Sequence, residues 1–161
     1  RHEYITLGKE LDFLRTYIFL EEKRMQVPLL TTLYHDPELS PELTYIPGML
    51  LQPLVENSFQ HGLLHKSEPG SIDIRLEIST PKLLKCTVSD NGVGFYHSQK
   101  IHKNWKSMEG YSGLEVTRER LSLIGTRINQ HLELTITELT DSVGAPIGTS
   151  VCFFLPYKLY D

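Results

Sequence analysis

The sequence is poor in features that would each point to a particular class of protein. Its 161 residues include only two cysteines, Cys86 and Cys152, and both stand inside apolar, strand-like runs. Small domains stapled by disulfides need a denser cysteine pattern, so we expect two buried, reduced thiols that behave as small hydrophobic side chains. No apolar run approaches the roughly 18 residues of a membrane-spanning helix.

An excess of positive charge is also missing. Lysine and arginine number 16 against 20 aspartates and glutamates, which gives a net charge of -4 and argues against a protein that binds the backbone of DNA or RNA. A content of 40% hydrophobic and 22% charged residues is ordinary for a soluble globular domain. Because the sequence starts at Arg1 rather than at a methionine, we expect a part of a longer protein.

Hydrophobic periodicity predicts both helices and strands. Apolar residues recur at helical spacing over residues 6–25, with Thr6 as N-cap, and again after Pro47 and after Leu114. Alternation predicts strands over 72–79 and 84–88, joined by a turn at Pro81-Lys82, and over 132–139 and 150–155, with a short strand at 29–34. We therefore expect an α/β (α+β) two-layer sandwich, in which a mixed sheet of about five strands packs on about three helices.

The stretch from Pro47 to Leu63 carries unusual polar residues for a buried helix. Its apolar stripe consists of Leu50, Leu51, Leu54, Val55 and Phe59. Asn57 and His61 lie one turn apart at the edge of this stripe, beside Glu56, and Gly62 follows as a stop in the left-handed conformation. An acid, an amide and an imidazole in the last two turns indicate a role beyond packing. A zinc pair of His61 and His65 is the weaker alternative, because Gly62 separates them and no third ligand has suitable spacing.

Asp90 ends a predicted strand and precedes Asn91-Gly92-Val93-Gly94. Glycines let the backbone turn sharply and approach a ligand closely, and an acid fixed at a strand end can accept a hydrogen bond from an exocyclic amine such as the 6-amino group of adenine. A simple hairpin turn is the alternative, because Asn-Gly is a common turn dipeptide. The lack of an immediate return strand after Gly94 weighs against it.

A third candidate site begins at Ser112-Gly113-Leu114. A glycine at the start of a helix leaves backbone N–H groups free to bind phosphate, and Arg118 or Arg120 could add a charged donor; a solvated helix face is the alternative. The preceding stretch, Phe95 to Ser112, has no apolar period and has the length of a mobile lid.

Four segments taken together resemble the ATP-binding domain of sensor histidine kinases: LQPLVENSFQHG, VSDNGVGF, SGLEVTRERL and GTSVCFFLP. They resemble the LytS-type subfamily in particular, whose domain is grouped with those of gyrase, the heat-shock chaperone ATPases and MutL as the GHKL or HATPase group, with a Bergerat-type fold. The leader TLGKELDFLRTYIFLEEKRM resembles the subfamily's connection to its phosphoacceptor region. The resemblance thus implies a linker helix over residues 1–27 and an ATP-binding catalytic domain over 28–161.

The resemblance also implies roles for the matched residues. Asn57 would hold Mg²⁺ against the triphosphate of ATP, and His61 would reach the phosphate side of the site, with Glu56 in a supporting catalytic role. The remaining nucleotide contacts would be Asp90 for adenine, Gly92 and Gly94 for the pocket floor, Phe95 to Ser112 as the ATP lid, Gly113 and Leu114 in the glycine element, Arg118 as a phosphate donor and Thr149 beside the adenine.

Three departures from the family pattern affect the expected activity. Pro53 stands where related ATPases carry a catalytic glutamate, four residues before Asn57, so a phosphotransferase fits better than a hydrolase. The lid is poor in glycine, which leaves a degenerate nucleotide-sensing or partner-docking module as the alternative function. The phosphoaccepting histidine of the family is absent, because His2 lacks its usual setting.

The implied partners follow from the same resemblance. They are ATP and Mg²⁺, phosphoacceptor helices in the same protein or its dimer partner, and a response regulator whose aspartate finally receives the phosphoryl group. We expect no direct contact with nucleic acid. The parent would be a homodimeric bacterial sensor kinase, anchored in the inner membrane through a missing N-terminal part, with this domain in the cytoplasm.

Overall fold

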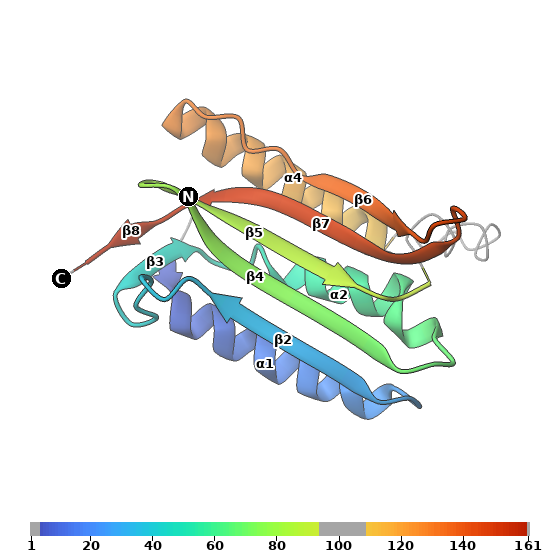
Figure 1. The fold of residues 1–161 in the computed structure, drawn as a ribbon. Coiled ribbons are helices and arrows are strands. Elements are labelled where there is room, and N and C mark those ends of the chain that lie inside the picture. The colour runs from blue at the N-terminus through green and yellow to red at the C-terminus, as the bar shows by residue number, and fades with distance from the viewer. Residues whose placement is uncertain (1–3, 94–108, 161) are drawn as a thin grey trace.

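A computed structural model of the chain describes residues 4–93 and 109–160 (Figure 1). Its main sheet has five strands in the order β2-β4-β5-β7-β6. β2 runs parallel to β4 and all other neighbours are antiparallel, so the sheet is mixed, as predicted. The strands are β2 (Leu29–His35), β4 (Gly70–Thr80), β5 (Leu83–Asp90), β6 (Thr135–Thr140) and β7 (Pro146–Pro156).

Within residues 4–93 and 109–160, three helices cover one face of this sheet (Figure 1), and this confirms the predicted two-layer sandwich. They are α1 (Leu7–Arg24), α2 (Gln52–His61) and α4 (Glu109–Ile128), and a short 3₁₀ turn, η1 (Leu63–His65), follows α2. The predicted cap of α1 is confirmed, because the Thr6 hydroxyl accepts a hydrogen bond from the Lys9 N–H at 3.2 Å. Among the described helices, none combines the length and the apolar character that a membrane span requires.

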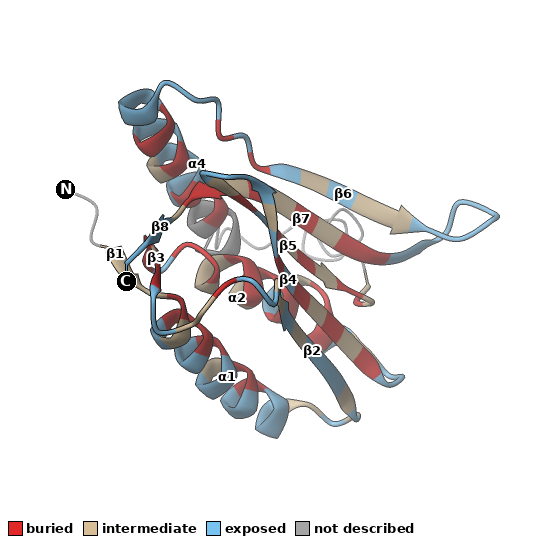
Figure 2. Cartoon of the chain, turned by 60° about the vertical axis from the view of Figure 1, so that its left-hand side comes forward, coloured by how far each residue is buried: buried red, intermediate tan, exposed pale blue. Residues whose placement is uncertain are grey.

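A single hydrophobic core fills the space between the two layers (Figure 2). The predicted stripe of five apolar residues is buried throughout, although Leu50 and Leu51 precede α2. Helix α1 contributes residues at helical spacing, namely Leu7, Leu11, Leu14 and Ile18. Cys86 faces this core, whereas Cys152 is only partly buried, and both thiols are free. The expectation of two buried thiols was therefore wrong for Cys152. This residue lies opposite Thr87 in the register of β5 and β7, and its side chain is therefore on the other face of the sheet from Cys86.

A second, three-stranded sheet was not predicted. β1 (Tyr4–Thr6), β3 (Thr44–Pro47) and β8 (Lys158–Leu159) pair in the order β1-β3-β8 and bring the two ends of the described chain together. Strands of two to four residues are too short to show alternation, so only their pairing defines them. β3 leads directly into the turn Gly48–Leu51, after which α2 begins later than its apolar run suggests.

The start of α4 differs from its predicted position, whereas its end agrees with the prediction of a stop at Gly125 or a little later. The helix begins at Glu109 rather than near Leu114, and it continues past Gly125 to Ile128. Asn129 then takes a left-handed conformation with φ of 53°, and the Gln130 N–H donates to the Gly125 carbonyl at 2.9 Å, as in a Schellman cap. A Cβ on Gly125 would collide with the Gln130 carbonyl oxygen, so this glycine permits the return of the chain rather than stopping the helix.

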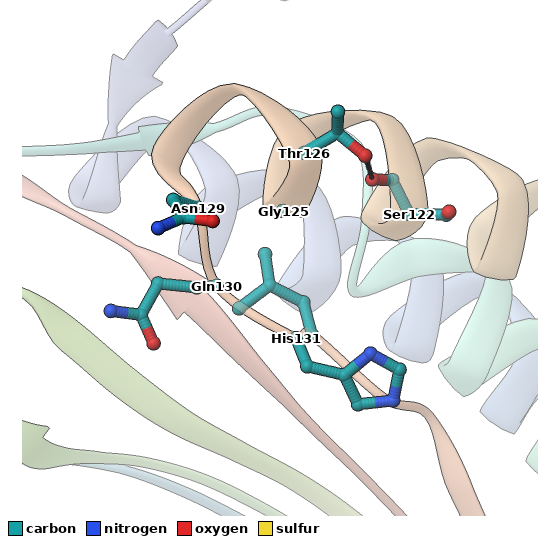
Figure 3. A pocket seen from close by; sticks show the side chains of 7 residues that line it. Ser122, Gly125, Thr126, Asn129, Gln130 and His131 are labelled. Atoms are coloured by element: carbon teal, nitrogen blue, oxygen red, sulfur yellow. Dashed lines mark hydrogen bonds between the residues drawn. The ribbon is translucent and has the colours of Figure 1, made fainter.

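A hollow of about 520 Å³ lies beside this cap (Figure 3). The hydroxyl of Thr126 donates to the Ser122 carbonyl at 2.9 Å, inside the helix itself. The hollow lies where the chain returns after the end of α4. Its lining residues are Ser122, Gly125, Thr126, Asn129, Gln130, His131 and Leu132.

Candidate functional site

The end of α2, the end of β5 and the start of β7 meet at one end of the sandwich (Figure 1). Asp90 and Thr149 are paired directly across β5 and β7, and both are buried, with exposed fractions of 6% and 5%. Gly148 allows this close approach, because a Cβ there would collide with the carbonyl oxygen of Asp90. The structure thus brings together two residues that are 59 positions apart and that the sequence placed in one site.

Two glycines join α2 to the segment after β5. A Cβ on Gly92 would collide with the backbone of Gly62, and a Cβ on Gly62 would lie 2.9 Å from the Ser58 carbonyl oxygen and 3.1 Å from Asp90 Oδ1. The predicted helix stop at Gly62 is confirmed, because α2 ends at His61 with Gly62 as its C-cap, but the φ of -140° shows that the predicted left-handed conformation was wrong. Glycine is needed here for backbone-to-backbone packing, which holds the end of α2 against the Asp90 carboxylate.

The Asp90 carboxylate is held by hydrogen bonds from three directions. The Gly92 N–H donates to Oδ1 at 2.8 Å, and the Ser58 hydroxyl and the Thr149 backbone N–H are further partners. Burial raises the pKa of Asp90 to about 6, although these donors and the positive charge of Lys66 lower it. The result is a fixed, buried acceptor that is mostly ionised at neutral pH and suits an amino group on a ligand.

The hairpin alternative for Asp90–Val93 is wrong. Both edges of β5 are already occupied, by β4 and β7, so no returning strand can pair with it. Asn91 instead ties the segment to the start of β4: its Oδ1 accepts the Ser71 N–H at 2.7 Å. The Lys66 ammonium donates to the Asn91 carbonyl at 2.8 Å, which places a positive charge near Asp90.

Asn57 presents a buried amide oxygen without a hydrogen-bond partner among the described residues. The residue is 3% exposed, and its Oδ1 has no hydrogen-bond partner in the part of the chain that the structure describes. An unsatisfied buried polar group costs about 1–3 kcal/mol, and an amide oxygen is a normal ligand for Mg²⁺. His61, one turn further along α2, is half-buried. The donor chemistry at Asn57 therefore fits a hard cation.

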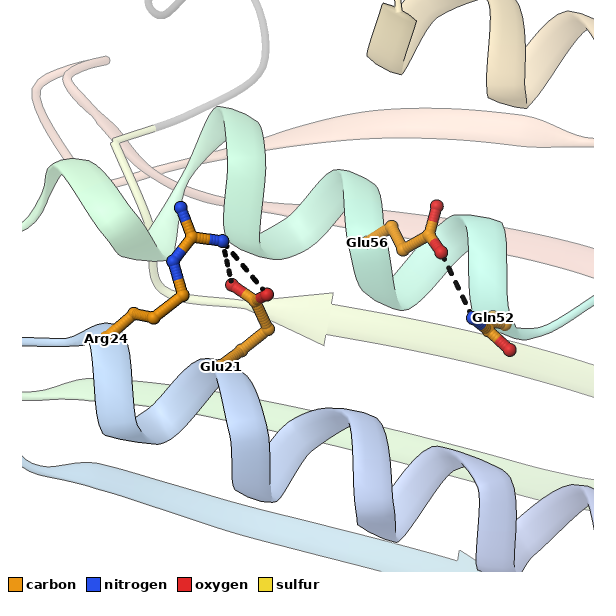
Figure 4. A network of polar contacts seen from close by, with 4 residues as sticks. All are labelled: Glu21, Arg24, Gln52 and Glu56. Carbon is orange, nitrogen blue, oxygen red and sulfur yellow. Dashed lines mark hydrogen bonds and ion pairs between the residues drawn. The ribbon is translucent and has the colours of Figure 1, made fainter.

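Glu56 forms a hydrogen bond within α2. Its carboxylate accepts a hydrogen bond from Gln52 Nε2 at 3.1 Å, one turn earlier on α2 (Figure 4). Burial, followed by the charges of Glu21 and Glu56, raises the pKa of Tyr17 on α1, so the Glu56 charge acts on the α1 side. Pro53, the second residue of α2, occupies a position where its missing N–H breaks no helical bond. One turn before Asn57 there is accordingly no carboxylate.

The third predicted site, at Ser112-Gly113-Leu114, does not lie at a helix start as expected, because α4 begins earlier. Gly113 is the fifth residue of that helix, so the expectation of a glycine at the helix start with free N–H groups was wrong. Leu114 is buried and Arg118 is exposed. Arg120 is occupied elsewhere, because its guanidinium donates to the carbonyls of Gly48 at 2.9 Å and Met49 at 3.2 Å.

Some predicted residues lie outside the described chain, and some described residues were not predicted. Gly94 and residues 95–108 of the expected lid fall among the former, and residues 109–112 belong to α4. Ser58 and Lys66 are the main omissions, since both act on Asp90. Ser58 could have been placed on the buried side of α2 from its position beside Asn57, but its partner 32 residues away leaves no pattern in the sequence.

Comparison with known proteins identifies the fold and the family. A family model described as histidine kinase-, DNA gyrase B- and HSP90-like ATPase matches residues 47–159. In solved structures, the chain is similar to the histidine kinase domain of the Erythrobacter litoralis EL346 blue-light activated histidine kinase, with a TM-score of 0.60, 21% identity, and coverage of 94% of this chain and 65% of that one. It is also similar to the mycobacterial sensor histidine kinase MprB, with a TM-score of 0.58, 15% identity, and coverage of 99% and 100%.

Curated relatives point to one group within this family. The chain is 29% identical over 161 residues to the sensor protein LytS of Oceanobacillus iheyensis, which covers 96% of this chain and 25% of that protein. It is 35% identical over 98 residues to a sensor-like histidine kinase of Staphylococcus epidermidis, covering 61% and 18%. The chain thus spans about a quarter or less of these relatives. It belongs to the family of histidine kinase-, DNA gyrase B- and HSP90-like ATPases, as an ATP-binding domain of the kind found in LytS-type sensor histidine kinases.

Proposed function

We propose that the chain binds Mg-ATP between α2 and the ends of β5 and β7, and presents the γ-phosphate to a histidine on a separate segment. The observation that carries this proposal is the Asp90 carboxylate, which is buried, held by three donors and close to Gly92 and Thr149. An acceptor fixed in this way suits the exocyclic amine of adenine, and guanine, which has a carbonyl at the corresponding position, would not supply that donor.

Asn57 is the proposed metal ligand, because its buried amide oxygen has no partner among the described residues. Bound Mg²⁺ would neutralise charge on the triphosphate. His61 would contact the phosphate side, one turn from Asn57, and Arg118 would add a positive charge from the exposed side of α4. Gly94, Gly113 and Leu114 are the remaining proposed nucleotide contacts, and Gly113, inside α4, would act without a free helix-start N–H group.

The proposed reaction is phosphoryl transfer rather than hydrolysis. Pro53 offers no group to activate water, and Glu56 is bonded to Gln52, so we assign Glu56 a supporting role. A bond would form between an imidazole nitrogen of the acceptor and the γ-phosphorus as the bond to the ADP oxygen breaks. The chain's own contribution is positioning and charge neutralisation.

The wider setting is proposed from the LytS-type relatives. Residues 1–27 would link this domain to phosphoacceptor helices in the same protein or in its homodimer partner. The phosphoryl group would pass onward to an aspartate of a response regulator. The domain would work on the cytoplasmic side of an inner membrane that holds the sensor part.

Two measurements test the proposal. Calorimetry on this chain should show ATP binding that is strengthened by Mg²⁺ and is much weaker for GTP; equal affinity for the two nucleotides would remove Asp90 as an adenine acceptor. The natural protein that contains this chain, incubated with γ-labelled ATP and Mg²⁺, should gain an acid-labile, base-stable phosphate. ATP binding without labelling would instead support the nucleotide-sensing module, and steady hydrolysis by this chain would favour an ATPase.

A further inference from the structure

The turn Gly48–Leu51, which connects β3 to α2, is held by two elements that are far from it in the sequence. Glu10 of α1 is 1% exposed, and its Oε2 accepts the Met49 N–H at 3.1 Å, while the nearby Leu51 N–H also favours the charged carboxylate. Arg120 of α4 donates to the carbonyls of Gly48 and Met49. The peptide groups on both sides of Met49 are thus fixed by charged side chains.

Met49 itself shows that this turn is constrained. Its φ of 62° lies in the left-handed region, which is unfavourable for any residue with a side chain. The Met49 side chain is 45% exposed, so burial of that side chain does not explain the conformation. Strained backbone of this kind persists only where the surroundings over-determine it, and Glu10 and Arg120 are the groups that do so.

Burying Glu10 is unfavourable for packing alone. Burial raises the pKa of its carboxyl group, whereas the two backbone donors and the charge of Arg120 lower it. The buried face of α1 is otherwise made mainly of leucine and isoleucine. An acid at this position therefore serves the turn rather than the core.

The turn Gly48–Leu51 is connected directly to the proposed site through α2. The Leu51 carbonyl accepts the N–H groups of Leu54 and Val55, so the turn is continuous with the first turn of α2. Asn57 follows Leu51 by six residues, about 9 Å along a rigid helix. α4, which carries Arg120, also carries Leu114 at the proposed site.

We propose that Glu10 and Arg120 are positioning residues that fix the conformation of the turn Gly48–Leu51. Through this turn, the packing positions of α1 and α4 determine the position of Asn57 on α2. This inference rests on the proposed function. The inference implies that Mg-ATP binding and the packing position of α1 depend on each other, because coupling between two sites is reciprocal. Asp90 is held mainly by the Gly92 N–H and by its neighbours in β5 and β7, and only the Ser58 hydroxyl and the end of α2 at Gly62 link it to this helix.

The test compares Mg-ATP and adenosine binding by calorimetry. Glu10→Ala and Arg120→Ala should each weaken Mg-ATP binding about tenfold, within the usual range for coupled sites. Adenosine binding, which depends on Asp90, should fall by much less, because Ser58 is only one of the three donors to that carboxylate. The double variant should lose little more than the worse single variant, because both act through one turn. Should Glu10→Ala fail to fold, Glu10→Gln retains the size and one acceptor oxygen and carries the same expectation with a smaller loss.

Two controls separate positioning from general destabilisation. Ile18→Val trims the buried face of the same helix α1 without touching the turn, and Arg127→Ala removes an exposed charge near the end of α4. Both should bind Mg-ATP as the unmodified chain does. Unchanged Mg-ATP binding in the Glu10 and Arg120 variants, or an equal loss of adenosine binding, would overturn the inference. Failure of the unmodified chain to bind Mg-ATP would instead refute the proposed function.

Hydrogen exchange provides a readout of the turn itself. The Met49 and Leu51 amides should exchange more slowly when Mg-ATP is bound, and Glu10→Ala should remove that dependence on nucleotide. If the exchange rates of these two amides change neither with Mg-ATP nor with the substitution, the inference is also overturned.

Discussion

Replacing Asp90 with asparagine should stabilise the fold and abolish its proposed function at the same time. The side chain is almost fully buried, and burial raises its pKa from an ordinary value of 3.8 to about 6. Ionised Asp90 is therefore less favourable in the folded chain than in the unfolded chain. Asparagine has nearly the same shape, retains an oxygen that can accept the Gly92 N–H and carries no charge.

The size of the effect follows from the two pKa values. The shift of roughly 2 units, at 1.36 kcal/mol per unit, corresponds to about 3 kcal/mol. Between pH 4 and 6 the folded state binds more protons than the unfolded state, so the stability of the unmodified chain falls as pH rises through this interval. Asp90→Asn removes this loss. The gain should be largest above pH 6, up to about 3 kcal/mol or roughly 6–12 °C in Tm for a domain of this size, and should disappear near pH 4.

The assay is urea denaturation of the unmodified chain and of Asp90→Asn between pH 4.5 and 8, paired with calorimetry of ATP binding. The two stability curves should diverge with rising pH, whereas ATP affinity should be lost in the variant at every pH, because an amide no longer offers a charged acceptor to the adenine amine. Parallel stability curves would show that Asp90 does not titrate near pH 6. Unchanged ATP affinity would remove Asp90 from adenine recognition.

Binding to the unmodified chain should depend on pH through the same group. An amine donor favours the ionised carboxylate, so the affinity for adenosine should fall below pH 6, by up to about tenfold per pH unit. Adenosine is the suitable probe, because it lacks phosphates that titrate in the same range. Asp90→Asn should show weak and pH-independent binding, and a matching pH profile in both chains would assign the titration to another group.

Two further substitutions test the metal ligand and the packing of the site. Asn57→Ala should weaken Mg-ATP binding at least about tenfold, in line with the effects of ligand changes at metal sites, and should leave metal-free ATP binding nearly unchanged; equal losses by calorimetry would remove Asn57 from the metal. Gly92→Ala should cost about 1–3 kcal/mol in thermal unfolding, because its Cβ would collide with the backbone of Gly62. A melting temperature equal to that of the unmodified chain would show that the two segments can separate freely.

Local patterns in the sequence determined most of the fold. The periodicity of α1 and α2 and the alternation in β4, β5 and β7 arise from the same side chains that fill the core, so the layers and the buried faces could be read in advance. The two main residues of the candidate site were also locally visible in the sequence. Asn57 stands at the polar end of an apolar helix, and Asp90 stands where an alternating strand gives way to glycine.

Tertiary structure alone decided how these residues are held. Gly62 acts through contact with Gly92, and the hydrogen bonds of Ser58 and Lys66 reach residues 25 or more positions away. The small sheet β1-β3-β8 and the hold of Glu10 and Arg120 on the turn Gly48–Leu51 likewise join distant segments. Periodicity records which face of an element is buried, because burial repeats along the chain. A contact between two single residues far apart in sequence repeats nowhere, so only the folded chain reveals it.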